Sequence, residues 1–214
     1  MGTAFLIAFA LVMLAELGDK SQLLLVGFAT RYRPVPVLVG AAIAIAVLQL
    51  IAVALGRVVG SLIPTRPVAV VAGVVFIVFG VLAWRDGAEE AADAKPRQPS
   101  RLGPVLTVAA AFFVAEFGDK TQLMTMSIAA DPAAALRTLG ALAPAVAPPA
   151  AGSATAAVGV WLGSSLGMLA ADALAVGIGV ALGRRLPAQT LARVSAVAFV
   201  GFGIVTLASA FVGS

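Results

Sequence analysis

The sequence contains no cysteine and no histidine, and these absences remove whole classes of chemistry. Without cysteine there is neither a disulfide nor a thiol nucleophile. Without histidine as well, Cys/His zinc or copper sites, a haem held by an axial histidine and a histidine proton relay are excluded. Any polar centre must therefore be built from carboxylates, lysines, hydroxyls, amides and backbone groups.

Charge is also scarce, because only 11% of the 214 residues are charged whereas 61% are hydrophobic. Soluble domains carry about a quarter charged residues. The net charge is +4, but the basic residues form no run of the kind that binds nucleic acid. The composition therefore predicts an all-α polytopic membrane protein that lies in the lipid bilayer and has no nucleic-acid partner.

Six segments are apolar enough to span a membrane, which takes about 20 residues. They are Thr3–Thr30, Val35–Ile63, Val68–Trp84, Leu102–Ala129, Ala154–Gly183 and Thr190–Val212. The hydrophilic stretch 85–101 is predicted to be a solvated linker between two halves, 1–84 and 102–214. The stretch at about 131–154 is rich in Ala and Pro, and its prolines predict an apolar loop outside the membrane.

Lysine and arginine in the loops predict the orientation. Nine of them fall on the side of the linker: Arg31, Arg33, Arg85, Lys95, Arg97, Arg101, Arg184, Arg185 and Arg193. Three fall on the other side: Arg57, Arg66 and Arg137. The positive-inside rule then places the linker in the cytoplasm and both termini outside. We therefore expect a multi-pass protein of the cell (inner or plasma) membrane.

The chain contains an internal repeat. The stretch "AELGDKSQLL" at 15–24 recurs as "AEFGDKTQLM" at 115–124, an offset of 100, and an offset of 123 then relates later pairs such as Gly40 and Gly163. Each repeat holds three predicted spans, an odd number, so the second copy should insert upside down. Inverted repeats of this kind place a midplane site in many secondary transporters. We therefore predict six transmembrane helices in two inverted three-helix repeats, with the two motifs facing each other.

Each motif places charges in the middle of an apolar span. On a continuous helix Glu16, Asp19 and Lys20 would share one face, and the cost of charge in hydrocarbon requires a partner or a cavity there. In a purely structural alternative, the glutamate of each motif pairs with the lysine four residues later and only holds helices together. That alternative leaves Asp19 and Asp119 without an obvious partner, so we favour a functional site.

The charges of the two motifs add up to those of an ion site. Four carboxylates balanced by Lys20 and Lys120 leave a charge of −2, which matches one divalent cation, and oxygen ligands suit Ca²⁺, Mn²⁺ or Mg²⁺. Further neutral oxygens are available from Ser21, Gln22, Thr121 and Gln122. Because neighbouring carboxylates strengthen each other's hold on protons, protons and metal would compete for the same oxygens. Such competition is the physical basis of a cation/proton exchanger.

Asp172 is a further acid within a predicted span, and the offset of 123 aligns it with Gln49. The repeats are therefore unequal at this position. Asp172 is a candidate for a proton pathway or for support of the site. A structural aspartate hydrogen-bonded near Ser164 or Ser165 is an equal alternative.

The paired motifs "ELGDKS" and "EFGDKT" resemble the signature of a cation/proton exchanger family. That family includes Golgi and chloroplast transmembrane transporters of Ca²⁺ and Mn²⁺ and bacterial manganese exporters. The resemblance covers nearly the whole chain, apart from the Ala- and Pro-rich insertion, which departs from a usually short connection. It implies metal coordination by four residues, Glu16, Asp19, Glu116 and Asp119. It also implies export of Mn²⁺, with Ca²⁺ as the other candidate, in exchange for H⁺ and without a prosthetic group.

Two other functions compete with this hypothesis. An exporter of amino acids or other small zwitterions would use Lys20 and Lys120 to bind a carboxylate and the acids to bind an ammonium group. An intramembrane lipid-phosphate enzyme can also have inverted repeats, but phosphoryl chemistry favours arginine, and no arginine falls near the middle of a span. We therefore expect a transporter rather than an enzyme.

Overall fold

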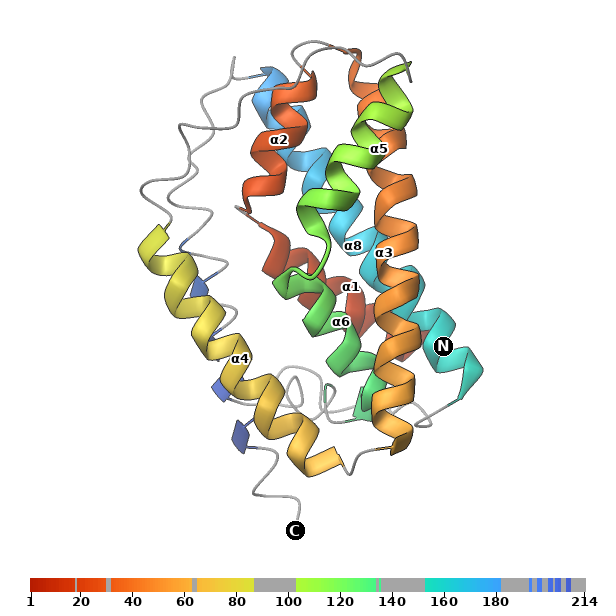
Figure 1. Cartoon of the computed structure of the whole chain (residues 1–214), viewed down its shortest axis with the longest axis vertical. Helices are drawn as coiled ribbons and strands as arrows, with labels where there is room; N and C mark the ends of the chain where they lie inside the picture. Colours follow the sequence, from red (N-terminus) through yellow and green to blue (C-terminus); the bar gives the residue numbers. More distant parts are fainter. Residues whose placement is uncertain are drawn as a thin grey trace.

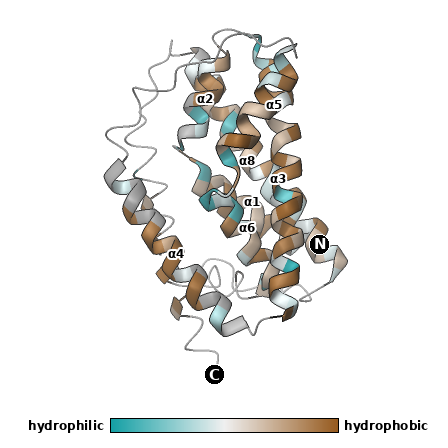
Figure 2. Cartoon of the chain, viewed as in Figure 1, coloured by the Kyte–Doolittle hydropathy of each residue, from teal (hydrophilic) through white to brown (hydrophobic). Residues whose placement is uncertain are grey.

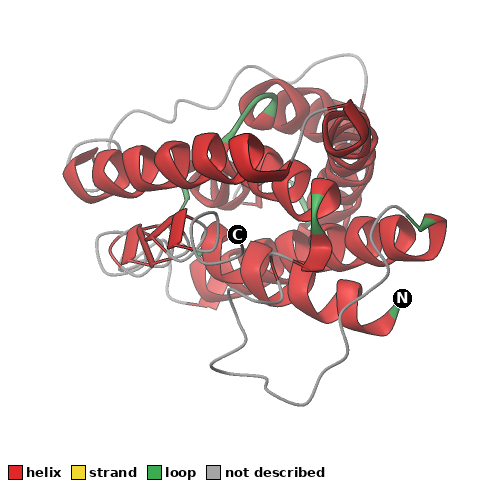
Figure 3. Cartoon of the chain, turned by 90° about the horizontal axis from the view of Figure 1, so that it is seen from below, coloured by secondary structure: helices red, strands yellow, loops and turns green. Residues whose placement is uncertain are grey.

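The computed structural model describes residues 1–17, 19–29, 32–62, 65–86, 103–133, 135 and 153–181, together with single positions between 193 and 208. Within these residues the chain forms helices and no strand (Figure 3). The helices are α1 (Gly2–Glu16), α2 (Lys20–Ala29), α3 (Pro34–Leu62), α4 (Thr65–Asp86), α5 (Gly103–Glu116), α6 (Lys120–Ala130) and α8 (Ala154–Ala181). The all-α prediction is therefore confirmed for the part of the chain that is described.

Three predicted spans match single helices. The segments Val35–Ile63 and Ala154–Gly183 correspond to α3 and α8, both of which are long and apolar enough to cross a membrane. Val68–Trp84 lies inside α4, which extends beyond it at both ends. These segments are mostly apolar, and two of the polar side chains that they contain, Gln49 and Asp172, are buried.

The other two described spans, Thr3–Thr30 and Leu102–Ala129, are not continuous helices. Each is broken at its motif, so that α1 ends at Glu16 and α2 begins at Lys20, while α5 ends at Glu116 and α6 begins at Lys120. In the second break Gly118 has a φ of +81°, a left-handed conformation that glycine adopts without steric cost. The prediction that Glu16, Asp19 and Lys20 share one face of a continuous helix is therefore wrong.

Several predictions fall on residues at the margins of the described ranges. The predicted linker begins inside α4, which ends at Asp86, and residues 87–102 lie outside the described part. The predicted loop at about 131–154 is helical at Pro132, Ala133 and Ala135, and residues 136–152 lie outside the described part. Most of the last predicted span, Thr190–Val212, also lies outside the described part.

The two halves of the chain are interleaved. The broken helix α1–α2 packs against α8 of the second half, and the broken helix α5–α6 packs against α3 of the first half. In Figure 1, α1 and α2 run upward whereas α5 and α6 run downward, and α3 and α8 likewise run in opposite directions. Helices from opposite halves therefore form each main packing interface.

Glycines allow these long helices to approach the broken ones closely. At each such glycine an added Cβ would collide with the partner helix, and the partner positions follow the two offsets of the sequence repeat. The pairs are Gly40 with Val105, Gly163 with Phe5, Gly56 with Met126, and Gly179 with Val26. The same contact between the halves is thus made twice, once by each long helix, as close packing on small residues allows between apolar helices.

The outer surface of the bundle is apolar, whereas its interior contains the polar residues. Large hydrophobic side chains such as Leu6, Leu50, Leu55 and Val114 are about half exposed or more. Figure 2 shows hydrophilic residues gathered where α1 and α2 meet and where α6 begins. An apolar exterior of this extent is typical of a surface that contacts lipid.

The glycine contacts predict a difference between two substitutions in one helix. Gly163→Ala should destabilise the protein by about 1–3 kcal/mol because the new methyl group meets the backbone of Phe5. Gly177→Ala is the matched control in α8: nothing lies within 4 Å of its added Cβ, so it should be neutral or stabilising by about 0.5–1 kcal/mol. Thermal unfolding of both variants in detergent measures the difference, and equal midpoints would contradict the packing described.

Candidate cation site

Two broken helices bring four helix ends to one place. α1 and α5 end at Glu16 and Glu116, and α2 and α6 begin at Lys20 and Lys120. The turns are alike, since the backbone N–H of Asp19 donates to Glu16 O at 3.2 Å and that of Asp119 donates to Glu116 O at 3.1 Å. Helix C-termini present carbonyl oxygens and helix N-termini present N–H groups, each with a partial charge. The breaks therefore add backbone dipoles to the charges of the motifs.

Three carboxylates from both motifs converge at these breaks. Glu16, Asp19 and Glu116 each offer an oxygen, and these oxygens all lie within 4.8 Å of one another. Glu16 is 0% exposed and Glu116 is 2% exposed. Oxygens that bind Ca²⁺ lie about 2.3–2.6 Å from the ion, so two ligands on opposite sides of it are about 5 Å apart. The spacing therefore suits one divalent cation held between the motifs.

The fourth predicted ligand, Asp119, lies beside this group rather than in it. It is half-buried, and its side chain is next to that of Asp19. Two carboxylates side by side in a low-dielectric interior cannot both stay charged without a cation or a proton nearby. Asp119 thus adds to the demand for positive charge at the same place.

One lysine links the two motifs. Nζ of Lys120 lies 3.0 Å from Oδ2 of Asp19, and both side chains are about nine-tenths buried. The structural alternative in which each motif pairs its own glutamate and lysine is therefore wrong for Lys120, whose ion pair crosses to the other motif. The side chain of Lys20 lies outside what the structure describes.

The neutral polar residues of the motifs have different roles. The hydroxyl of Ser21 donates to Oε1 of Glu16 at 2.8 Å, which orients that carboxylate. Gln122 instead holds the second break in place: its Oε1 accepts from the Gly118 N–H at 2.8 Å, and its Nε2 donates to Leu48 O at 3.2 Å. Gln22 and Thr121 are also buried. Of the predicted neutral oxygens, that of Gln122 is thus already engaged.

Asp172, on α8, does not have the structural partner that one alternative proposed. Ser164 donates its hydroxyl to Trp161 O at 3.2 Å. Asp172 is 0% exposed, and neither of its oxygens has a hydrogen-bond partner among the described residues. Asp172 lies close enough to Glu16 and Asp19 for their negative charges to repel one another. Asp172 therefore belongs to the polar centre.

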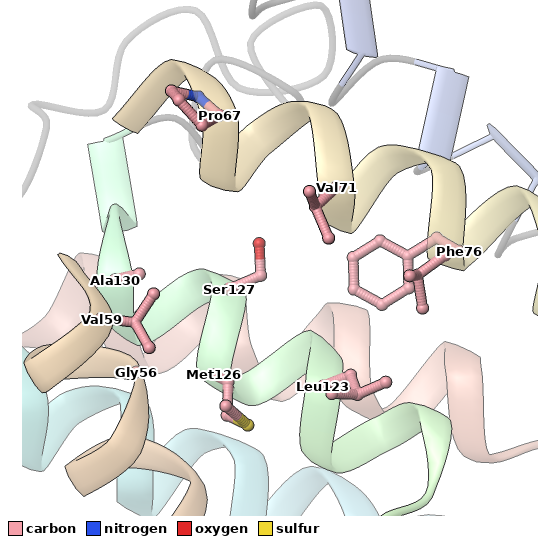
Figure 4. A pocket seen from close by; sticks show the side chains of 10 residues that line it. Gly56, Val59, Pro67, Val71, Phe76, Leu123, Met126, Ser127 and Ala130 are labelled. Carbon is pink, nitrogen blue, oxygen red and sulfur yellow. The ribbon is translucent and has the colours of Figure 1, made fainter. Parts of the chain in front are cut away.

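A separate apolar cleft lies between α4 and the pair formed by α3 and α6. Its volume is about 290 Å³ (Figure 4). Its lining residues are Gly56, Val59, Pro67, Val71, Val75, Phe76, Leu123, Met126, Ser127 and Ala130. The cleft contains no carboxylate, so it is not the cation site.

Comparison with known proteins finds similarity along most of the chain. A family model described as "Divalent cation/proton antiporter GDT1" matches residues 4–91 and 147–214, which include the first motif and α8 but not the second motif. A Vibrio cholerae protein named "Putative manganese exporter" is 31% identical over 212 residues, which are 96% of this chain and 89% of that protein.

Two plant proteins are more distant. "GDT1-like protein 3" of Arabidopsis thaliana is 25% identical over 92% of this chain and 68% of its own length. "Protein PAM71, chloroplastic", also from Arabidopsis thaliana, is 28% identical over 97% of this chain and 57% of its own length. No solved structure matches the chain.

The left-handed glycine in the second break predicts how that position tolerates substitution. Nothing lies within 4 Å of a Cβ added to Gly118, so only backbone strain opposes a side chain there. Gly118→Val should therefore destabilise the protein by about 1–2 kcal/mol, and Gly118→Asn should cost less because asparagine visits this conformation more readily. Thermal unfolding of the two variants tests the order, and a more stable valine variant would refute it.

Proposed function

This chain belongs to the GDT1 family of divalent cation/proton antiporters, and on that premise we propose that it exports Mn²⁺ across the cell membrane in exchange for protons. The observation that carries the proposal is the convergence of Glu16, Asp19 and Glu116 within 4.8 Å, in the interior and from both repeats. The name of the Vibrio cholerae relative supports Mn²⁺ over Ca²⁺, since oxygen ligands accept both ions.

Electrostatics explains why metal and protons would exchange at this site. The cation would bind to Glu16, Asp19 and Glu116, with Asp119 beside them, and Lys120 would offset part of their charge. Once the metal leaves, the buried carboxylates must regain positive charge, because isolated charges are costly in hydrocarbon. Protons are the smallest substitute. The site would therefore alternate between a metal-bound state and a protonated state.

We further propose that the chain has six spans in two inverted repeats, with α1–α2 and α5–α6 each counted as one broken span. Corresponding helices run in opposite directions, and the glycine contacts follow both repeat offsets. Broken helices with charged ends at mid-depth are a common way to bind ions in secondary transporters. The excess of lysine and arginine on the side of the linker 85–101 supports a cytoplasmic linker and two external termini.

The geometry disfavours the zwitterion exporter. Of the two lysines that this function would use to bind the carboxylate of the substrate, Lys120 is paired with Asp19 at 3.0 Å. The space between the three carboxylates is also of ionic rather than molecular size. The observations therefore support a metal ion as the substrate.

Transport in proteoliposomes tests the proposed function. Mn²⁺ flux should depend on a pH gradient, and Glu16→Gln or Asp119→Asn should abolish it because each removes a carboxylate from the site. Asp131→Asn is the matched control, since Asp131 caps the far end of α6, and it should transport normally. Normal flux in Glu16→Gln would refute the shared site, and amino-acid flux without Mn²⁺ flux would favour the zwitterion exporter.

Competition between protons and metal predicts the effect of pH on binding. Mn²⁺ binds the ionised carboxylates, and protons bind the same oxygens, so acidification should weaken Mn²⁺ binding to the purified protein. Titration calorimetry at several pH values in detergent measures the affinity and the protons released. An affinity that does not change with pH, together with no proton release, would contradict the exchange mechanism. Parallel titrations with Ca²⁺ decide which ion the site prefers.

A further inference from the structure

Asp172 lies on α8 at the level where α1 ends and α2 begins. Five residues before it, Gly167 packs on α1, with its added Cβ 2.6 Å from Phe9 O. Seven residues after it, Gly179 packs on α2, where an added Cβ would lie 2.8 Å from the side chain of Val26. Because α8 is one continuous helix between these contacts, Asp172 is positioned beside the first break. This placement agrees with the interaction of its charge with Glu16, Asp19 and Glu116.

Gln49 occupies the corresponding place on α3, beside the second break. Gly40 packs on α5, where an added Cβ would lie 2.5 Å from Val105 O, and Gly56 packs on α6 against Met126. Gln49 lies between these two contacts and is 1% exposed. Each long helix thus carries one buried polar side chain at the height of the motifs. The sequence repeat aligns the same two positions.

Where α3 and α8 are in contact, the side chain of Gln49 reaches the turn of α8 that precedes Asp172. Nε2 of Gln49 donates to Sδ of Met168 at 3.5 Å, and Met168 is one helical turn before Asp172. Among the described residues, neither Oε1 of Gln49 nor either oxygen of Asp172 has a hydrogen-bond partner. Buried polar oxygens without a partner are costly. Two of these oxygens belong to Asp172, beside the first break, and one belongs to Gln49, at the level of the second break, so a cation held between the motifs would lie at the same height as all three.

We propose that α8 and α3 add a lateral pair of cation ligands to the site, the carboxylate of Asp172 and the amide oxygen of Gln49. This inference rests on the proposed function and adds to its ligand set, because ions such as Ca²⁺ take six to eight oxygens, whereas Glu16, Asp19 and Glu116 each bring one oxygen to within 4.8 Å of the others. One member of the pair is charged and the other is neutral. The cation is therefore held more strongly on the side of α1, α2 and α8 than on the side of α5, α6 and α3.

Equilibrium binding of Mn²⁺ to the full-length chain in detergent tests the pair separately from transport. Asp172→Asn should weaken Mn²⁺ binding by about 10–100-fold, the range found when a residue that supports a metal site is lost. Ser165→Ala, which removes a buried hydroxyl from the same helix, is the control and should bind normally. Thermal unfolding of each variant shows that it is folded.

A swap variant provides the more stringent test. Asp172→Gln should weaken binding, and adding Gln49→Asp to it should recover affinity, because the carboxylate then returns on the equivalent position of the other long helix. No recovery in the folded double variant would overturn the pairing of the two positions. Normal Mn²⁺ affinity in Asp172→Asn would overturn the role of Asp172 as a ligand. This conclusion would hold even if the variant had lost proton-driven Mn²⁺ flux.

The proposal and the proposed function fail in different ways. If the wild-type chain binds no divalent cation, both are wrong. If Glu16→Gln abolishes Mn²⁺ binding while Asp172→Asn and Asp172→Gln leave it unchanged, the site is correct and the lateral ligands are not. If Asp172→Asn weakens binding and the swap restores it, the lateral pair is established.

Discussion

The structure depends on one constraint, which is that carboxylates inside an apolar bundle must be matched by positive charge. Glu16 and Glu116 are almost fully buried, and Asp172 is completely so. A charge in hydrocarbon costs from a few to more than ten kcal/mol. The ion pair between Lys120 and Asp19 meets only part of this demand. A divalent cation or protons would supply the rest of the positive charge. A site that can be neutralised by either one is suited to exchanging metal for protons.

The breaks in the helices expose backbone groups that can help to stabilise charge at the buried carboxylates. A continuous helix would keep all its backbone groups in internal hydrogen bonds and offer only side chains to an ion. Here α1 and α5 end at glutamates, and the next helices begin at Lys20 and Lys120. The negative ends of two helix dipoles and the positive ends of two others therefore lie at the same point. Irregular backbone in an apolar surrounding is tolerated where protein encloses it, and Glu16 and Glu116 at the breaks are buried within the bundle. Gly118 permits the second break.

The interleaving of the two halves makes the site a shared one. Each broken helix packs on the long helix of the opposite half, through glycines that let the backbones approach. Neither repeat could therefore position its motif alone. A shared site could also be unequal, because the equivalent positions Gln49 and Asp172 carry a neutral and an acidic side chain on two long helices that pack alike.

The sequence by itself determined the helical class, the family, the repeat and the residue types of the site, because ligand chemistry and hydropathy are properties of the residues themselves. It placed α3 and α8 to within a few residues and identified three acids that do converge. It did not decide whether the helices break at the motifs, because a glycine beside charged residues fits both an interrupted helix and a continuous helix in close contact with a neighbour. The pairing of Lys120 with Asp19 and the unpartnered oxygens of Asp172 and Gln49 were decided only by the tertiary structure, since they depend on which helices from opposite halves lie side by side.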